Sequence, residues 1–493
     1  MKMNCFYLFF LCAMAFFLIQ APSESAQGAT VAVQPGPTAA IAPFYRCVRN
    51  FYVSTTGRDS NAGTQASPWL TIQHADSSSR MPGDCINVAA GTYNARVLIQ
   101  HGGNAPTPTG YVVYRCTTLD KCHVLAPGGG HLWGISNSGS FSVIDGFELD
   151  GNNALLKDGI ADDCVDSDGA TYGTGNSAHH IWVMNNILHH CNLAGIGLNN
   201  KEWYYVLHNT VYHNAYTSGY QGSGIGLVVV QCIEKGNANC ASGSTYKGGT
   251  GTYTPSGMDL TYWPPFHIVI SGNRVYSNMI AASNPVPCGS HTDGNGIIMD
   301  TFLDQTTNTI PFPYQSIVTG NISYANGGRG IHVYRTSNVT VANNTVWGNG
   351  TDRCITDYFL GDLSQAGGSN NVWMNNIARS VLTAFNPACG AYCGRRNAPL
   401  VAGNSGFNAD SNNSYTRNVL YGGLGVQKFN NDATYFSCAN NKCNDYPLIV
   451  GGNTGNFALD KISPAIGYAL VESFLPQRLT DAGACSSALK SCQ

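Results

Sequence analysis

The sequence predicts an all-β fold, a single-stranded right-handed parallel β-helix with about 23 residues in each coil. Two observations predict it: short motifs recur at fixed spacings, and the composition suits strands and turns. Charged residues make up only 11% of the 493 residues, whereas glycine accounts for 57 of them. Low charge with abundant glycine is typical of a turn-rich β architecture and unlike a helical protein.

Two motifs repeat along the chain. In one, an asparagine precedes a short apolar alternation, and in the other a Gly-Ile pair is followed by a second apolar residue. The asparagine lies 9 residues before the glycine in two coils, and the next asparagine follows 14 residues later, so the period is 23. At about 3.3 Å per residue, a coil has a perimeter of roughly 75 Å, which fits three short strands. The motifs occur at Asn186, Asn209, Asn273, Asn321, Asn344, Asn376 and Asn418, and at Gly195, Gly224, Gly296 and Gly330.

The period predicts how the coils stack. Successive coils are expected to form three parallel sheets, with neighbouring strands about 4.8 Å apart. The repeated asparagine falls at a turn, where its amide can bond to the asparagines of the coils above and below. We therefore predict one buried column that contains Asn186, Asn209, Asn321 and Asn344. Asparagine-rich composition alone would not repeat two independent spacings.

The two ends of the chain differ from the repeat. Lys2, an apolar run over 5–19 and small residues near position 25 are typical of a secretory signal. A membrane anchor is the alternative, although the run is shorter than a span of about 20 residues. We expect a signal peptide over 1–25, a disordered leader over 26–45, the β-helix domain over 46–470, and a C-terminal tail with a disulfide over 471–493.

Cysteine content and net charge indicate the compartment of the protein and the classes of partner that it can have. Of the 18 cysteines, Cys5 and Cys12 lie in the expected signal, which leaves an even number. In a secreted chain this favours disulfides over metal ligands, with the pairing left open. A net charge of −3 gives no reason to expect nucleic acid as a partner. After removal of the signal we expect no membrane segment and an extracellular monomer. Close neighbours in sequence are Cys116 and Cys122, Cys232 and Cys240, Cys389 and Cys393, Cys438 and Cys443, and Cys485 and Cys492.

Segments near both ends of the expected domain contain motifs that resemble those of a known protein family. At the start they are Phe51-Tyr52-Val53-Ser54, Asp59-Ser60-Asn61, Pro68-Trp69, Pro82-Gly83-Asp84 and Ala90-Gly91-Thr92-Tyr93, and at the end Gly455-Asn456-Phe457 and Ser463-Pro464-Ala465-Ile466. They resemble the pectate lyase-like right-handed parallel β-helix proteins, particularly polysaccharide lyases of the Pel9A kind. The resemblance covers about residues 50–467 and implies the fold and a polysaccharide partner. It does not select a chemistry, because this fold hosts lyases, hydrolases, epimerases and binding proteins.

The resemblance also implies a metal. Family members with lyase activity tend to carry an aspartate cluster for calcium and a basic proton acceptor on neighbouring coils. The acidic run in this sequence is Asp162, Asp163, Asp166 and Asp168, so calcium is the implied cofactor. This sequence departs from the pattern at the proton acceptor, for which Lys201 is the nearest lysine in coil register.

Insertions interrupt the coils on both sides of the Gly-Ile strand. Segments 215–223 and 279–293 precede this strand, and segments 229–262 and 301–313 follow it. Long loops on both sides of one sheet predict a groove, and grooves are where ligands usually bind.

The register of the Gly-Ile strand predicts which side chains face this groove. Side chains alternate along a strand, so the third and fifth residues of the motif point outward. With the register extended to Gly159, Asp163 and Asp300 lie three coils apart, or roughly 14 Å. That exceeds the separation of about 9.5 Å that an inverting hydrolase pair allows. The third-position column is Ala161, Gly197, Gly226, Ile298 and His332, and the fifth-position column is Asp163, Asn199, Val228, Asp300 and Tyr334.

A candidate catalytic cluster follows from these columns. Asp300 and His332 fall on adjacent coils, Arg329 lies in the turn before His332, and Asp293 enters from the flanking loop. A uronan lyase must neutralise a carboxylate and remove the adjacent C5 proton. Arg329 or calcium suits the first task, and His332, oriented by Asp300, suits the second. The alternative is a cluster that only stabilises turns. The predicted substrate-binding residues are Asn199, Lys201, His291 and Tyr334.

The function that these residues favour is cleavage of an acidic, uronate-containing polysaccharide by β-elimination. Two alternatives stay open: a glycoside hydrolase on the same scaffold, and a non-catalytic carbohydrate-binding or surface protein. Thr292-Asp293-Gly294 is similar to part of a polygalacturonase motif. The paired aspartates and the Gly-His-Gly that would follow are absent from the sequence, so hydrolysis by that particular route is not expected.

Overall fold

The structure is a computed structural model of the whole chain, which divides into two compact units, Met1–Gln34 and Pro35–Gln493. All described residues lie in the second unit, so the expected signal peptide falls outside them. The described residues are 43–77, 79–127, 132–152, 163–167, 177–217, 219–236, 240, 251–281, 284–303, 310–355, 360–381, 397–403, 411–429, 432–472 and 481–485.

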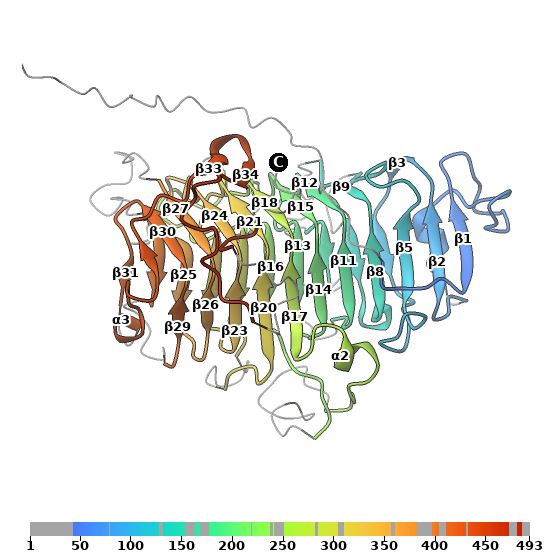
Figure 1. Cartoon of the computed structure of the whole chain (residues 1–493). Helices are drawn as coiled ribbons and strands as arrows, with labels where there is room; N and C mark the ends of the chain where they lie inside the picture. Colours follow the sequence, from blue (N-terminus) through green and yellow to red (C-terminus); the bar gives the residue numbers. More distant parts are fainter. Residues whose placement is uncertain are drawn as a thin grey trace, which may run out of the picture. The chain divides into compact units, whose positions relative to one another are not determined.

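Three long parallel sheets dominate the described residues (Figure 1). The first sheet contains β1 (Arg49–Val53), β2 (Asp84–Val88), β5 (Val112–Cys116), β8 (Ser142–Asp145), β11 (Ile181–Met184), β14 (Tyr204–Leu207), β17 (Phe266–Ser271), β20 (Gln315–Thr319), β23 (Val339–Ala342), β26 (Val372–Met374) and β29 (Ser414–Thr416). The second sheet contains β4 (Val97–Ile99), β7 (Trp133–Ile135), β10 (Val165–Asp166), β13 (Ile196–Asn199), β16 (Ile225–Val228), β19 (Ile297–Asp300), β22 (Ile331–Tyr334), β25 (Leu360–Ala366), β28 (Asn397–Ala402) and β31 (Gln427–Lys428). The third sheet contains β3 (Gly91–Asn94), β6 (Cys122–Leu125), β9 (Glu148–Asp150), β12 (Ile187–His189), β15 (Thr210–Tyr212), β18 (Arg274–Tyr276), β21 (Ile322–Tyr324), β24 (Thr345–Trp347), β27 (Ile377–Ser380), β30 (Val419–Gly422) and β32 (Lys442–Cys443).

The connectivity is that of a right-handed parallel β-helix, as the sequence predicts. From β2 to β32, strands that follow one another in the chain enter different sheets, and the strands of each sheet pair in parallel from coil to coil. β1 pairs in parallel with β2 within the first sheet. Regular helices among the described residues are single turns. They are α1 (Ile72–Ala75), α2 (Met258–Thr261), α3 (Asp432–Tyr435) and the 3-10 turns Asn137–Gly139 and Gly452–Thr454; β33 (Ile449–Gly451) and β34 (Asn456–Leu459) form a short antiparallel pair.

The core fills the inside of the coils. Isoleucines that occupy the same strand position in successive coils pair in register, as Ile196 does with Ile225 and Ile297 does with Ile331. All four are fully buried. Because side chains alternate along a strand, these inward columns leave the intervening positions to face outward. The register that the sequence predicts for β13, β16, β19 and β22 is therefore confirmed.

An asparagine ladder runs along one turn of the coils, as predicted. Asn186 and Asn321 each donate a backbone and a side-chain hydrogen bond to the side-chain oxygen of the next asparagine, Asn209 and Asn344 respectively. All four are fully buried. A second ladder, which the sequence analysis does not predict, joins Asn214, Asn278, Asn326 and Asn349 and ends on Asp362.

Disulfides close several turns. Where both cysteines are described, three of the pairs that are close in sequence are bonded, and three more disulfides join residues farther apart. They are Cys116–Cys122, Cys232–Cys240 and Cys438–Cys443, then Cys47–Cys85, Cys164–Cys191 and Cys288–Cys354. No helix within the described residues is long and apolar enough to cross a membrane.

One insertion does not lie where the groove argument puts it. In the described part of segment 229–262, Ile233 and Met258 pack into an apolar cluster with Trp182 and Tyr205. Both of these aromatic residues lie on the first sheet and outside the main core. This part of the insertion therefore covers the outer face of the first sheet, because its apolar side chains find partners there.

Candidate active site

A pocket opens on the outer face of the second sheet, with a volume of about 420 Å³ that includes open solvent at its mouth. Its floor is made by outward-facing positions of β13, β16 and β19, which include Gly197 and Gly226. One wall comes from segment 221–223, at the end of the insertion that the sequence analysis expects there. Three carboxylates line the pocket: Asp163, Asp293 and Asp300.

Two insertions are joined beside this pocket. The side-chain oxygen of Gln221 accepts hydrogen bonds from the backbone N–H and the hydroxyl of Thr292. The side-chain amide of Gln221 donates to the carbonyl of Ser290 at 3.1 Å. These bonds hold segment 215–223 against the loop that carries Asp293. The insertions predict both loops as walls, but the sequence pattern does not indicate Gln221.

Asp163 reaches the pocket from the turn before β10. One of its carboxylate oxygens accepts the backbone N–H of Ala194 at 2.7 Å. The other lies over Gly197, where a Cβ atom would stand only 2.2 Å from it. Residue 197 therefore has to be glycine if Asp163 is to keep this position.

The strand register expected for this coil is wrong. The sequence pattern predicts Gly159-Ile160-Ala161 as the strand, with Asp163 in the fifth position. In the structure the strand is β10, where Val165 pairs with Ile196 and Asp166 with Gly197. Asp166 therefore takes the column position assigned to Ala161, and it is fully buried. The error arose because this coil carries its strand on a Cys-Val-Asp sequence and not on a Gly-Ile pair.

The pKa of Asp293 is far from its ordinary value. Its side chain accepts hydrogen bonds from the amide of Asn295 at 2.9 Å and from the hydroxyl of Thr292 at 3.4 Å. Burial and the nearby charge of Asp300 raise the pKa of Asp293 to about 7, although Arg329 and the two hydrogen bonds act in the opposite direction. Asp293 is thus a carboxylic acid that still carries its proton in part at neutral pH.

Asp300 is the last residue of β19 and lines the pocket. Its carboxylate accepts the hydroxyl of Thr301 at 2.7 Å. Burial raises the pKa of Asp300, while Thr301 and the charge of Arg335 lower it. Because Asp293 and Asp300 repel each other when both are charged, the first proton that the pair binds is held more tightly than that of an isolated carboxyl group.

The two basic candidates lie beside this pair and are buried. Arg329 donates to the carbonyl of Thr292 at 3.1 Å, and its backbone N–H donates to Asn295. The His332 ring nitrogen Nδ1 lies 3.3 Å from the carbonyl of Ser364. Burial lowers the pKa of His332 well below its ordinary value, and the charge of Arg329 lowers it further. His332 is therefore neutral, and neither residue is among those that line the pocket.

Two of the predicted substrate-binding residues differ in their surroundings. Asn199 lines the pocket, and its backbone N–H donates to the hydroxyl of Ser167 at 2.8 Å. Lys201 is buried, and its charge contributes to lowering the pKa of His179, after burial and His180. Lys201 is thus close to His179 and is not among the pocket-lining residues.

The other two predicted contacts lie outside the pocket lining. His291 is fully buried, with Nδ1 2.7 Å from Asp352 and Nε2 3.0 Å from the carbonyl of Val286. Cys354 lies close enough to His291 and Asp352 to suggest a metal cluster, but its sulfur is bonded to Cys288. Tyr334 is half-buried and pairs in register with Asp300.

The calcium prediction can be followed at two of its four residues. Asp162 and Asp168 lie outside the described residues. Asp163 presents one oxygen over Gly197, and Asp166 is buried and pairs in register with the same glycine. Carboxylate oxygens are the ligands that calcium prefers, so the side chains of Asp163 and Asp166 are of the kind that binds calcium.

Comparisons with known proteins concern the fold. No protein-family model matches this sequence, and no curated protein matches it. Among solved structures, pectate lyase Pel9A is 14% identical with a TM-score of 0.43 and covers 92% of this chain and 100% of its own. A rhamnogalacturonan lyase is 14% identical with a TM-score of 0.42, covering 75% of this chain and 87% of its own. A GH136 lacto-N-biosidase from Eubacterium ramulus is 13% identical with a TM-score of 0.41, covering 75% and 56%. The chain is similar in fold to these proteins, which include the Pel9A kind that its sequence segments resemble.

Proposed function

We propose that this protein is a secreted enzyme that cleaves a polysaccharide bound across β13, β16 and β19, and that it does so by hydrolysis. The observation that carries the proposal is the pair formed by Asp293 and Asp300 in one pocket, with a pKa of about 7 for Asp293. Two carboxyl groups whose environments separate their protonation states are the equipment of a glycoside hydrolase.

The floor of the pocket suits a sugar chain. Gly197 and Gly226 lie side by side in register on neighbouring strands. Without side chains there, a sugar ring can approach the backbone closely. Asn199 and Gln221 line the same pocket and offer amide groups that can bond to hydroxyls. The side-chain oxygen of Gln221 is already used by Thr292, which leaves Asn199 as the better candidate for a sugar contact.

The chemistry assigns one role to each carboxyl group. Asp293 donates its proton to the glycosidic oxygen as the bond from that oxygen to the anomeric carbon breaks. Asp300, ionised, stabilises the positive charge that develops at this carbon. Water then supplies its oxygen to the anomeric carbon, and the proton that water loses restores the starting state of the pair. The product is a new reducing end.

The second candidate is β-elimination from a uronate, and the position of Asp163 favours it. With Asp166 it belongs to the acidic run that the family resemblance links to calcium, and it faces the pocket. Calcium bound there would neutralise a uronate carboxylate. The described pocket lining, however, contains acids and amides and no basic side chain that could remove the C5 proton. Hydrolysis is therefore the better supported of the two.

Secretion belongs to the same proposal. The supporting features are the apolar segment after Lys2 and the disulfides among the described residues, since disulfides persist in oxidising compartments. A polysaccharide outside the cell is a substrate that such an enzyme can reach. Calcium and the monomeric state remain predictions of the sequence.

The test is a panel of acidic and neutral polysaccharides incubated with the purified protein. Reducing ends and the ultraviolet absorbance of unsaturated uronates are measured together. Reducing ends without that absorbance, lost in Asp293→Asn and kept in the exposed-site control Asp445→Asn, support hydrolysis by this pair. Matching absorbance would instead establish β-elimination. Neither signal, with measurable binding, would identify a carbohydrate-binding protein without catalysis.

A further inference from the structure

A second cluster of reactive side chains lies on the third sheet, away from the acidic pocket. Leu149 and Leu188 pair in register between β9 and β12 and are fully buried in the core. Because side chains alternate, the next residue of each strand faces outward. These residues are Asp150 and His189, which also pair in register, and His190 follows in the turn after β12.

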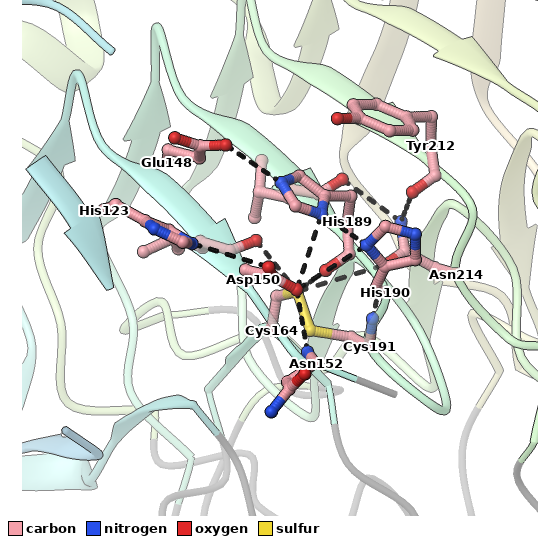
Figure 2. A network of polar contacts seen from close by, with 12 residues as sticks. His123, Glu148, Asp150, Asn152, Cys164, His189, His190, Cys191, Tyr212 and Asn214 are labelled. Carbon is pink, nitrogen blue, oxygen red and sulfur yellow. Dashed lines mark hydrogen bonds and ion pairs between the residues drawn. A yellow bond between two sulfur atoms is a disulfide. The ribbon is translucent and has the colours of Figure 1, made fainter. Parts of the chain in front are cut away.

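The ligand atoms of these three residues converge (Figure 2). Nδ1 of His189 lies 3.5 Å from Oδ1 of Asp150, and Nδ1 of His190 lies 3.6 Å from the same oxygen. In a tetrahedral zinc site with bonds of about 2.0–2.1 Å, neighbouring ligand atoms stand about 3.4 Å apart. Two of the three edges therefore already have the length that a bound zinc ion requires.

The third edge joins the two imidazoles. Nδ1 of His189 and Nδ1 of His190 are 2.7 Å apart. At this distance one of the two nitrogens has to carry a proton that the other accepts. A metal ion that replaces this proton needs the nitrogens to separate by about 0.7 Å, to the edge length of a tetrahedral site. Rotation of the His190 ring can supply that shift, since its side chain is 36% exposed.

Residues around the three proposed ligands contact them and fix their orientation, as the residues next to metal ligands usually do. Nε2 of His189, the nitrogen that faces away from the cluster, lies 3.3 Å from Oε1 of Glu148. A histidine that binds metal through one nitrogen usually donates its other N–H to such a carboxylate. Nε2 of His123 lies 3.4 Å from the second oxygen of Asp150 and contacts the same carboxylate from β6, as Figure 2 shows.

The backbone around the cluster is held firmly. The Cys164–Cys191 disulfide begins at the residue after His190, and the backbone N–H of Cys191 donates to the ladder residue Asn214. The ring of Tyr212 stacks on His189, with centroids 4.9 Å apart and planes 21° from parallel. Positions held in this way favour binding, because little freedom is lost when an ion enters.

We propose that Asp150, His189 and His190 bind a divalent transition metal of the zinc type, in a site separate from the acidic pocket. Two imidazole nitrogens and one carboxylate oxygen are ligands for zinc, copper or nickel and not for calcium or magnesium. Three protein ligands leave a fourth position open to water or to another donor. The partly exposed side chains of His190 and Asp150 give the ion a path from solvent.

The test uses the purified protein, freed of metal by dialysis against a chelator and titrated with zinc chloride by calorimetry. We expect one zinc ion per chain at this site. His189→Ala and His190→Gln should each weaken binding at least tenfold, and Glu148→Gln should weaken it by about 10–100-fold. The control His74→Ala removes an exposed histidine of α1 that is not part of the cluster, and it should leave binding unchanged.

Cobalt(II) serves as a second probe, because nitrogen ligands and low coordination number give it a strong visible absorption. The band should be present in the wild-type protein and absent in His189→Ala, and calcium chloride should not displace it. Melting temperatures of the metal-free variants establish that each is folded. Failure of the wild-type protein to bind zinc, or equal binding by the folded His189→Ala variant, would overturn the proposal.

Discussion

The acidic pocket and the histidine cluster both present partly buried aspartates on the outside of the same β-helix, yet their acidities shift in opposite directions. Burial and Asp300 raise the pKa of Asp293 to about 7. Burial also acts to raise the pKa of Asp150, but hydrogen bonds from His190 and from the backbone of Asn152, together with the charges of His189 and His190, lower it to about 2. The neighbouring groups, and not burial, decide the direction.

The difference assigns different chemistry to the two regions. In the pocket, carboxyl groups face one another, so one of them keeps a proton that it can transfer. In the cluster, a carboxylate faces imidazoles, so it stays charged and is ready to share a cation with them. A β-helix can separate such functions because each sheet offers its own outward columns on an unchanged core.

The largest effect is expected from removing the proton donor. Asp293→Asn keeps the shape of the side chain but cannot donate an acidic proton, so turnover should fall by about 10²–10⁴-fold. Asp300→Asn should also be impaired, because the stabilising charge is lost. Rates are measured beside melting temperatures, and His189→Ala is the matched variant from the other region. Near-normal turnover in folded Asp293→Asn would remove this pair from the mechanism.

Two glycines of the pocket floor offer a paired test. A Cβ at Gly197 would meet the carboxylate of Asp163 at 2.2 Å, whereas one at Gly226 meets only Ile298, at 3.7 Å. Gly197→Ala should therefore displace Asp163 and cost about 1–3 kcal/mol of unfolding free energy. Gly226→Ala should change it by about 0.5 kcal/mol or less.

Denaturant unfolding and activity are measured for both glycine variants. A loss of activity in Gly197→Ala greater than in Gly226→Ala supports a role for Asp163 at the pocket. Equal behaviour of the two would mean that Asp163 does not hold the position described above.

Much of this fold can be predicted from the sequence, because the same residue types occupy the same structural position in successive coils. The asparagine ladder and the Gly-Ile strands recur at fixed spacing, and both are confirmed at Asn186, Asn209, Gly195 and Gly224. The register was wrong in the coil of β10, where no Gly-Ile pair marks the strand. Periodicity therefore locates a strand only where the repeated residue is present.

The sites were harder to predict because their residues come from different coils. Asp293 and Asp300 were selected, and both line the pocket, but the sequence could not reveal that His332 is buried. The histidine cluster was missed, since Asp150 and His189 are adjacent only through the pairing of β9 with β12. Aligning Glu148-Leu149-Asp150 with Ile187-Leu188-His189 would have found it.

A smaller effect concerns stability and pH in the pocket. The pKa of Asp293 is about 7 in the folded chain and 3.8 as its ordinary value, so between these values the folded state binds more protons than the unfolded state. This group therefore stabilises the fold at low pH, and its contribution is lost as pH rises through about 7. Asp293→Asn should flatten that part of the stability profile, as measured by denaturant unfolding at a series of pH values.

The control for this prediction is His332→Gln, because burial keeps His332 neutral in the folded chain, whereas the unfolded histidine binds a proton below its ordinary pKa of 6.5. His332 therefore makes stability rise with pH up to about 6.5, which is opposite in sign to the effect of Asp293. His332→Gln should steepen the fall in stability below that pH, whereas Asp293→Asn should flatten it. Equal slopes between about pH 4 and 7 in the wild-type protein and in Asp293→Asn would mean that Asp293 keeps an ordinary acidity and is no proton donor.

The smallest effect separates the two regions by metal. A ligand at 100 times its dissociation constant stabilises the folded state by about 2.7 kcal/mol. Adding zinc to the metal-free protein should therefore raise its melting temperature by a few degrees and leave the rate of hydrolysis unchanged, since the ligands lie on the third sheet and the acids on the second.

A calcium-selective chelator should alter neither quantity if the pocket works by hydrolysis. If the rate falls when calcium is removed and returns when calcium is added, the reaction in the pocket is β-elimination. Asp163 and Asp166 are then the residues to substitute next.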